Sequence, residues 1–135
     1  MTTVLFACVH NAGRSQMAAA LFNQLVDPAE AHAISAGTDP GTRVHPEVIE
    51  AMLELGMDLS NAPATTLTPG LAAQASMLIT MGCGDQCPVV PGVIRDDWPL
   101  EDPKGRPLVQ VRAIRDDIRN RVRALLERES WARTR

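Results

Sequence analysis

Short apolar runs alternate with stretches of helical periodicity along the first third of this chain. Residues 2–7 form a short, mainly apolar run, which predicts a buried strand. Residues 15–26 repeat apolar side chains at helical spacing, and the Asp27–Pro28 pair ends that pattern. A second short strand is expected at residues 32–35, before a loop rich in Gly and Pro at residues 36–41. This part of the chain therefore predicts a strand, a helix and a strand.

The same alternation continues beyond the loop. Pro46 is typical of a first helical turn, so a helix is expected at residues 46–55, with Gly56 as its terminator. Thr68 is a candidate N-cap for a short helix that extends to residue 74. Residues 76–81 are mainly apolar and predict a third strand.

The last part of the chain predicts a weak strand, a loop and a long helix. The weak strand is expected at residues 93–94, the loop at residues 96–107, and the helix at residues 108–128. Strands that alternate with helices indicate an α/β fold with a parallel sheet between helices. We expect residues 1–135 to form a single three-layer domain around a four-stranded parallel sheet. Because ligands of such sheets bind beyond the carboxyl ends of the strands, the loops that follow the strands are where chemistry is expected.

The composition is that of a small enzyme. The 135 residues are 45% apolar and carry a formal net charge of −3, which argues against a nucleic-acid partner or a membrane surface. No apolar run approaches the ~20 residues that span a bilayer. Three cysteines are an odd number in a chain long enough to fold without disulfides. We therefore expect a cytoplasmic protein with functional thiols.

The strongest candidate site lies where the first strand meets the first helix. Cys8 follows the strand, and Arg14 follows Cys8 after five residues. A loop of this length can turn backbone N–H groups toward one tetrahedral anion, and the helix N-terminus adds positive potential there. Arg14 would complete the site with a bidentate guanidinium, and the same field favours a thiolate. These features predict a phosphate-like substrate, a sulfur nucleophile, and an oxyanion-binding loop made of Val9, His10, Asn11, Ala12, Gly13 and Arg14.

Three neighbours of the cysteine have candidate supporting roles. Ser15 is placed to donate its hydroxyl to the Cys8 thiolate as well as to begin the helix. Asn11 is expected to hold the loop in shape, with a left-handed backbone. His10 is either an exposed side chain or a source of positive charge near the thiolate.

A carboxyl group for acid catalysis is expected from the loop before the last helix. Asp102 would stand at the rim of an oxyanion site, where it could protonate a departing oxygen. A turn-forming Asp before Pro103 is the simpler interpretation. On sequence alone, Asp96, Asp97 and Glu101 compete for the same role.

Cys83 and Cys87 lie close together in a Gly-containing segment. They could be half of a zinc site, although the chain offers no second ligand pair, and we predict no metal. They could also be two ordinary thiols. The third interpretation is a redox relay, in which Cys83 attacks an oxidised adduct on Cys8 and Cys87 resolves the new disulfide.

The motif Cys8-x-x-Asn11-x-x-Arg14-Ser15, with Asp102 and Pro103 late in the chain, resembles the low-molecular-weight protein tyrosine phosphatase family. The string at residues 11–18 is similar to the arsenate reductase branch of that family. Other matching segments are residues 35–38, 45–46, 79–83 and 97–103. The resemblance spans nearly the whole chain and implies a phosphatase-like fold with an N-terminal Cys-x5-Arg phosphate-binding loop.

The resemblance also assigns roles. It implies that Cys8 is the nucleophile, that Arg14 and the loop amides form the oxyanion site, and that Ser15 stabilises the thiolate. It further implies that Asn11 organises the loop and that Asp102 is the general acid.

Three departures from the family pattern refine this expectation. Lys104 and Gly105 stand where the phosphatases typically have tyrosines, and the chain contains no Tyr, which favours a small inorganic anion. Cys83 and Cys87 are closer together than in thioredoxin-coupled reductases, which resembles the actinobacterial, mycothiol-dependent type. Ala19 occupies the position of a Glu that helps some of these reductases hold potassium, so no potassium site is expected.

The sequence therefore predicts an arsenate reductase that makes arsenite through a Cys8 adduct and a second thiol, for arsenic detoxification. Phosphate and sulfate would mimic arsenate in the loop. We expect no bound cofactor and an external thiol reductant, either mycothiol with mycoredoxin, which is favoured, or thioredoxin. The alternatives are a low-molecular-weight protein tyrosine phosphatase or small phosphomonoester phosphatase, and a non-catalytic oxyanion-binding module.

Overall fold

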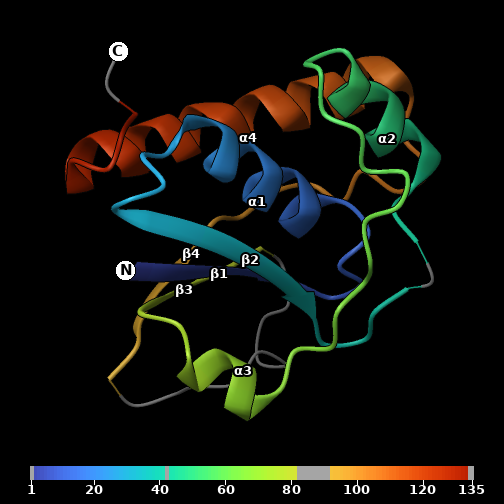
Figure 1. The fold of residues 1–135 in the computed structure, drawn as a ribbon. Coiled ribbons are helices and arrows are strands. Elements are labelled where there is room, and N and C mark those ends of the chain that lie inside the picture. Colours follow the sequence, from blue (N-terminus) through green and yellow to red (C-terminus); the bar gives the residue numbers. More distant parts are fainter. Residues whose placement is uncertain (1, 42, 82–91, 134–135) are drawn as a thin grey trace.

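The computed structural model describes residues 2–41, 43–81 and 92–133 of this chain. Its centre is a parallel sheet of four strands in the order β2-β1-β3-β4 (Figure 1). The strands are β1 (Thr2–Cys8), β2 (Ala31–Gly37), β3 (Met77–Thr80) and β4 (Ile94–Asp97). The predicted α/β fold with four parallel strands is confirmed.

Helices cover both faces of this sheet. Three of them, α1 (Arg14–Leu25), α2 (Pro46–Leu53) and α4 (Leu108–Glu129), lie on one face, and the short α3 (Pro69–Ala73) lies on the other (Figure 1). The three-layer arrangement follows from the alternation of strands and helices, because each parallel crossover carries the chain over one face of the sheet.

The side chains of β1 divide the core into two parts. Val4, Phe6 and Cys8 belong to the larger cluster beneath α1, α2 and α4, whereas Leu5 and Ala7 belong to a smaller cluster. This division reflects the two-residue alternation of side chains along a strand. Because both clusters are apolar, β1 is buried on both faces and reads as a continuous apolar run.

The carboxyl end of β1 lies where the order of the strands changes direction. From β1 the chain passes to β2 on one side, and it later reaches β3 on the other side of β1. Cys8 pairs with Gly37 of β2, and Ala7 pairs with Thr80 of β3. A sheet of this kind opens a crevice at such a switch point, and Cys8 is the last residue of the strand beneath it.

Strand β4 corrects the sequence-based boundaries. Residues 93–94 were expected as the strand and residues 96–107 as loop, but β4 extends from Ile94 to Asp97 and pairs with all of β3. All four residues of β4 are exposed, so its sequence lacks the apolar pattern of the other strands. Backbone pairing with β3 therefore determines this strand, and Asp96 and Asp97 belong to it.

Other boundaries differ by one to three residues. β2 extends further than residues 32–35 at both ends, and α1 begins at Arg14. Helix α2 ends at Leu53 instead of residue 55, and Gly56 then takes a φ of 83°, a left-handed conformation that favours glycine. Thr68 caps α3 as expected, because its side chain accepts a hydrogen bond from the N–H of Leu71.

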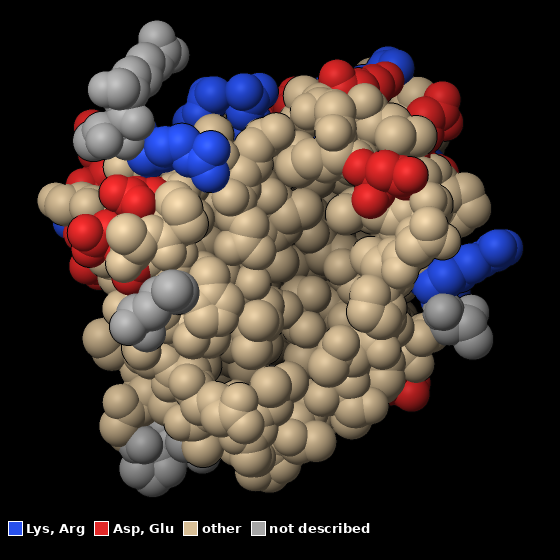
Figure 2. Space-filling view, in the orientation of Figure 1, with Lys and Arg blue, Asp and Glu red and all other residues tan. Residues whose placement is uncertain are grey.

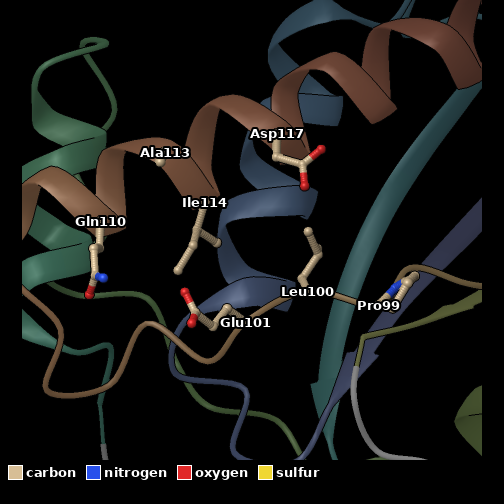
Figure 3. A pocket seen from close by; sticks show the side chains of 7 residues that line it. All are labelled: Pro99, Leu100, Glu101, Gln110, Ala113, Ile114 and Asp117. Carbon is tan, nitrogen blue, oxygen red and sulfur yellow. The ribbon is translucent and has the colours of Figure 1, made fainter.

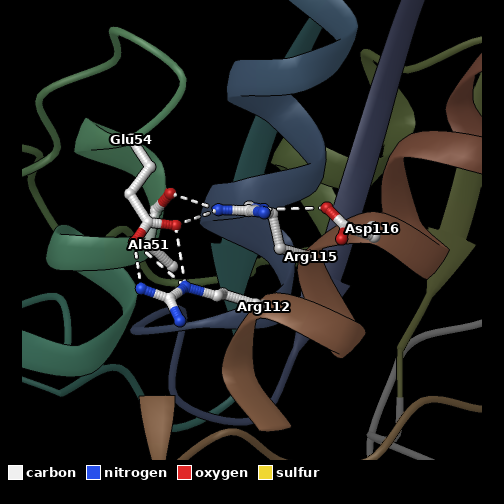
Figure 4. Close-up of polar contacts among 5 residues, drawn as sticks. All are labelled: Ala51, Glu54, Arg112, Arg115 and Asp116. Atoms are coloured by element: carbon white, nitrogen blue, oxygen red, sulfur yellow. Dashed lines mark hydrogen bonds and ion pairs between the residues drawn. The ribbon is translucent and has the colours of Figure 1, made fainter. Parts of the chain in front are cut away.

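An ionic network joins α2 to α4 (Figure 4). The carboxylate of Glu54 accepts hydrogen bonds from Arg112 Nη2 at 2.6 Å and from Arg115 Nη1 at 2.7 Å. Arg115 Nη1 also donates to the carbonyl of Ala51 at 2.8 Å, and Arg115 is itself buried. Bidentate arginine–carboxylate pairs have defined geometry, so this network fixes the C-terminal end of α2 against α4.

Charged side chains are distributed at the margins of the face seen in Figure 1. In the space-filling view, Lys, Arg, Asp and Glu lie mainly along the top and the two sides, and other residues form the centre and the lower part (Figure 2). The part of that face drawn in colour therefore shows no concentration of basic residues of the kind that attracts nucleic acid. None of the helices in the described ranges is long and apolar enough to cross a membrane.

Candidate functional site

The segment from Cys8 to Arg14, here called the oxyanion loop, has its carbonyl groups bound from outside. The carbonyl oxygens of Cys8, Val9, His10 and Ala12 accept from the N–H groups of Thr38, Asp39, Gly41 and His45, at 3.1, 2.7, 2.8 and 2.9 Å respectively. The carbonyl of Asn11 accepts from Gln16 Nε2 at 3.1 Å, and that of Gly13 from the N–H of Met17 at 3.0 Å.

The direction of these carbonyls determines the direction of the N–H groups. In a trans peptide the C=O of one residue and the N–H of the next point in opposite directions, and the described residues contain no cis peptide. Carbonyls that face outward therefore turn the successive N–H groups of the loop inward. The N–H of Asn11 illustrates this, because it donates to Cys8 Sγ at 3.3 Å. Convergent N–H groups at a helix N-terminus form an anion-binding concavity.

The thiol of Cys8 is buried and lies at the start of a polar chain. Its Sγ atom is 2.8 Å from Ser15 Oγ, and Ser15 Oγ also accepts from Asn11 Nδ2 at 2.8 Å. Because Asn11 supplies a proton to the Ser15 oxygen, the hydroxyl proton of Ser15 is available to the sulfur. A thiolate gains most from such a donor, since hydrogen bonds to charged groups are the stronger ones.

Asn11 is fixed by contacts on every side of its amide. Its φ is 50°, which confirms the expected left-handed backbone. Its side-chain oxygen accepts from the N–H of Thr65 at 2.9 Å and from Gln16 Nε2 at 3.3 Å. Gln16 is buried and also donates to the carbonyl of Pro63 at 2.9 Å. The segment from Pro63 to Thr65 thus anchors the oxyanion loop through Asn11 and Gln16.

Sequence reasoning assigned no role to Gln16 or to the segment at residues 63–65. Gln16 belongs to the segment at residues 11–18 that is similar to the arsenate reductases. The helical pattern of apolar residues does not distinguish a buried Gln at this position from an exposed one. The position of Gln16 depends on its hydrogen bond to Pro63, which is 47 residues away in the chain. The spacing of residues along the chain does not encode such a tertiary contact.

Gly37 allows β2 to approach the oxyanion loop. A Cβ atom at this position would lie 2.6 Å from the carbonyl oxygen of Val9 and 2.8 Å from the backbone nitrogen of Asn11. Both neighbours are backbone atoms that cannot yield cheaply, so only glycine fits here. The close approach brings Thr38 and Asp39 to the carbonyls that they bind.

Arg14 is positioned by the segment between β4 and α4. It is 9% exposed, and its Nη1 atom donates to the carbonyl of Leu100 at 3.0 Å. The side chain of Leu100 also lines a cavity of about 400 Å³ between residues 99–101 and α4, into which Ile114 projects (Figure 3). One nitrogen of the guanidinium is thus used for positioning.

Asp102 lies in the segment that contacts the oxyanion loop. Pro103 is buried, and a Cβ atom at Gly13 would lie 2.8 Å from Pro103 Cγ. The Asp102 side chain is exposed, and its Oδ1 atom accepts from the N–H of Lys104 at 3.0 Å. Asp102 is therefore next in the chain to a residue that contacts the loop.

The competing carboxyl groups have other partners. Asp96 accepts from Trp98 Nε1 at 3.3 Å, and Asp97 accepts from Thr80 Oγ1 at 2.6 Å. Glu101 pairs with Arg106 at 3.6 Å. Asp102 and Glu101 are each adjacent to a residue that contacts the loop, Pro103 and Leu100 respectively. Because Glu101 is paired with Arg106, the geometry favours Asp102.

Cys83 and Cys87 lie outside the described residues. Within the described ranges, no group of three or more His, Cys, Asp and Glu side chains could hold a metal ion. Ala19, the residue on which the expected absence of a potassium site depends, is buried in α1.

The sequence from residue 3 to residue 133 matches the family model described as low molecular weight phosphotyrosine protein phosphatase. The chain belongs to this family. The match includes the oxyanion loop, Asp102 and Pro103, and the phosphatase-like fold is the one described above.

Named relatives of this phosphatase family place the chain near arsenate reductases. A Halobacterium salinarum protein designated a candidate arsenate reductase is 40% identical over 123 residues, which are 87% of this chain and 85% of that protein. The structure of a thioredoxin-dependent arsenate reductase from Corynebacterium glutamicum has a TM-score of 0.79 and 38% identity, covering 94% of this chain. This chain spans only 61% of that longer protein.

A further solved structure, an arsenate reductase in the phosphate-binding state, has a TM-score of 0.80 and 32% identity. The likeness covers 95% of this chain and 98% of that one. The similarity therefore covers nearly the whole fold described above.

Proposed function

We propose that this protein catalyses the thiol-dependent reduction of arsenate to arsenite. The observations that support the proposal are the bound carbonyls from Cys8 to Gly13 and the N–H of Asn11, which donates to the buried thiol of Cys8 at 3.3 Å. Arsenate has the shape and charge of phosphate, so a site for one tetrahedral oxyanion serves the other. The relatives named as arsenate reductases support this choice.

In the first step the sulfur of Cys8 would attack arsenic(V). A sulfur–arsenic bond forms and an arsenic–oxygen bond breaks, and Asp102 would protonate the departing oxygen so that it leaves as water. Arg14 and the loop N–H groups would hold the remaining oxygens and balance the negative charge. Ser15 would stabilise the attacking thiolate through the contact with its hydroxyl.

In the second step another thiol would attack the sulfur of Cys8. A disulfide bond forms, and the sulfur–arsenic bond breaks with its electron pair remaining on arsenic. Arsenic(V) thereby becomes arsenic(III), and arsenite is released. The two electrons come from the two sulfur atoms, so an external thiol reductant is the only redox partner that the scheme requires.

The second thiol is proposed as mycothiol with mycoredoxin, with thioredoxin as the alternative. The short spacing of Cys83 and Cys87 supports the first, and the thioredoxin-dependent Corynebacterium relative supports the second. We further propose that residues 1–135 act as one domain in the cytoplasm, where such thiols are kept reduced. Cys83 and Cys87 are assigned a part in the relay only if thioredoxin is the donor.

The experiment is an arsenate turnover assay with each donor system supplied separately. We expect arsenite production with mycothiol and mycoredoxin, and its loss in Cys8→Ser. Turnover with thioredoxin alone, abolished by Cys83→Ser or Cys87→Ser, would overturn the mycothiol assignment. Absence of turnover with both systems would overturn the reductase proposal.

A phosphatase is the second candidate, because the family carries that activity in its description. It would use Cys8, Arg14 and Asp102 and would need neither Cys83 nor Cys87. Full phosphatase turnover in the Cys83→Ser, Cys87→Ser double variant, with no arsenate reduction by the parent protein, would favour it. The exposed Lys104 after Pro103, in place of the tyrosines of aryl-specific relatives, argues for the inorganic substrate.

A further inference from the structure

A cavity of about 300 Å³ lies beside the oxyanion loop, and the scheme above makes no use of it. Two of its lining residues, His10 and Ala12, belong to the loop itself. The remaining walls come from the segment before α2, from the first residue of α2 and from the segment after Asp102. The lining residues are His10, Ala12, Gly41, Arg43, Val44, His45, Pro46 and Lys104.

The polar lining of this cavity is basic. Arg43 and Lys104 are exposed cations, and His10 and His45 add two imidazoles. None of the described residues that line the cavity is acidic. Lys104 is also the single lysine of a chain whose net charge is −3, so this concentration of basic groups runs against the overall charge.

The two histidines are joined to the oxyanion loop through the backbone, His10 as a member of the loop and His45 through its N–H. The N–H of His45 donates to the carbonyl of Ala12 at 2.9 Å, and His10 Nδ1 lies 2.9 Å from the carbonyl oxygen of Asp39. Because a carbonyl can only accept, Nδ1 of His10 carries the proton in this contact. The cavity and the oxyanion loop are therefore parts of one fixed framework.

Burial lowers the pKa of His45, and the positive charges of Lys104 and His10 act in the same direction. The carboxylates of Asp102 and Glu47 oppose this shift. This shift favours the uncharged form of His45, which can still form hydrogen bonds. Arg43 and Lys104 supply the positive charge of the cavity. The hydrogen bond that positions Arg14 involves neither of them.

We propose that this cavity is a second oxyanion subsite, which binds a tetrahedral dianion such as arsenate or phosphate before it enters the oxyanion loop. Cations at the mouth of a concave site raise the local concentration of an oppositely charged substrate and its rate of association. The subsite would act on capture, so its contribution lies in kcat/KM and not in kcat. The kinetic part of this inference rests on the proposed function, whereas the binding part does not.

The binding test uses inorganic phosphate as the probe and protein whose Cys8 has been capped with iodoacetamide, which fills the oxyanion loop. The chain has three histidines, of which His10 and His45 line the cavity and His32 lies on β2. We expect saturable phosphate-induced shifts in the imidazole NMR signals of His10 and His45, and no shift for His32. The Arg43→Gln, Lys104→Gln double variant is expected to lose these shifts.

The kinetic test compares Arg43→Gln and Lys104→Gln with Arg123→Gln. Arg123 is an exposed residue of α4 that lies outside the cavity lining, so this control removes the same charge elsewhere. We expect each cavity variant to lower kcat/KM for arsenate about five-fold at low ionic strength, with kcat unchanged. The loss should shrink as salt screens the charges, and the control should remain at the parent value.

The outcomes separate the subsite from the proposed function. Equal shifts of all three histidines, or shifts that persist in the double variant, would overturn the subsite. If the protein does not reduce arsenate, the NMR arm still decides whether the subsite exists. A fall in kcat rather than in kcat/KM would show that the cations act on the reaction itself, and would also overturn the capture role.

Discussion

Gly13 and Pro103 are in contact across the site, so closely that a Cβ at Gly13 would lie 2.8 Å from Pro103 Cγ. This contact couples the end of the oxyanion loop to the segment that presents Asp102. The proposed general acid therefore has its position set by a residue that carries no side chain. Two halves of the candidate site, distant in sequence, are joined here by close packing.

The first prediction concerns this contact. Gly13→Ala should push Pro103 and Asp102 outward, because a proline ring has no flexible end that can move aside. We expect arsenate turnover to fall by about two orders of magnitude, the usual effect of a displacement of about 1 Å in a catalytic group. Steady-state kinetics measures this. The control is Gly70→Ala, since a Cβ there meets only Thr68 Oγ1 at 3.9 Å; equal losses in both variants would contradict the argument.

The second prediction concerns the contact between Ser15 and Cys8. Ser15→Ala removes the hydroxyl that lies 2.8 Å from the sulfur. Because a hydrogen bond to a charged group contributes about 1.5–3 kcal/mol, the rate of Cys8 alkylation by iodoacetamide at pH 7 should fall at least about ten-fold. Ser76→Ala, at an exposed position, should leave the rate unchanged. An unaltered rate in Ser15→Ala would mean that the hydroxyl does not stabilise the thiolate.

The third prediction tests Gln16 as a positioning residue. Gln16→Leu leaves the carbonyls of Asn11 and Pro63 without their donor. We expect a loss of about 1–3 kcal/mol in the free energy of unfolding, the cost of buried unpaired polar groups. Phosphate should also protect Cys8 from alkylation less well, which a merely structural role would not require. Gln24→Leu makes the same exchange at an exposed position of α1 and serves as the control; protection equal to that of the parent would remove Gln16 from the site.

The fourth prediction concerns pH and the network between α2 and α4. Hydrogen bonds from Arg112 and then Arg115 lower the pKa of Glu54 from 4.5 to about 2. A carboxyl group with a lowered pKa stabilises the fold fully above pH 4.5 and loses that contribution as the pH falls toward 2. Glu54→Gln should therefore be less stable than the parent at pH 7, and the difference should shrink below about pH 4.5.

Urea unfolding at a series of pH values measures this difference. Glu127→Gln, at an exposed position of α4, should follow the parent throughout. A stability difference that is the same at pH 7 and at pH 3 would show that the carboxylate charge of Glu54 is not involved.

Periodicity predicted the elements that are buried and could not predict those that are paired but exposed. Strand β1 and helix α4 have clear apolar patterns, and both were expected close to their observed positions. Strand β4 exposes all four of its residues, so its pairing with β3 defines it and no apolar pattern does. An edge strand of this kind leaves little trace in the sequence.

The site divides in a similar way. Cys8, Arg14 and Ser15 lie within eight residues of one another, so their geometry follows from one strand–loop–helix unit. The contact of Asn11 with Thr65 spans 54 residues, and the fit of Gly37 against the loop depends on the register of β2. Such contacts are properties of the assembled sheet, and no local spacing specifies them.

The outward-bound carbonyls of the oxyanion loop have a consequence for how this protein can change. Its anion receptor is made of peptide groups, and any residue type supplies the same peptide group. Substitutions at Val9, His10 and Ala12 would preserve the backbone N–H groups that bind the anion and would change only the side chains around them. A deletion that removed Thr38 or Gly41 would strip carbonyls of their partners and collapse it. The oxyanion loop can therefore tolerate side-chain variation because the segment after β2 binds its carbonyls. That segment in turn cannot change its length without losing these hydrogen bonds.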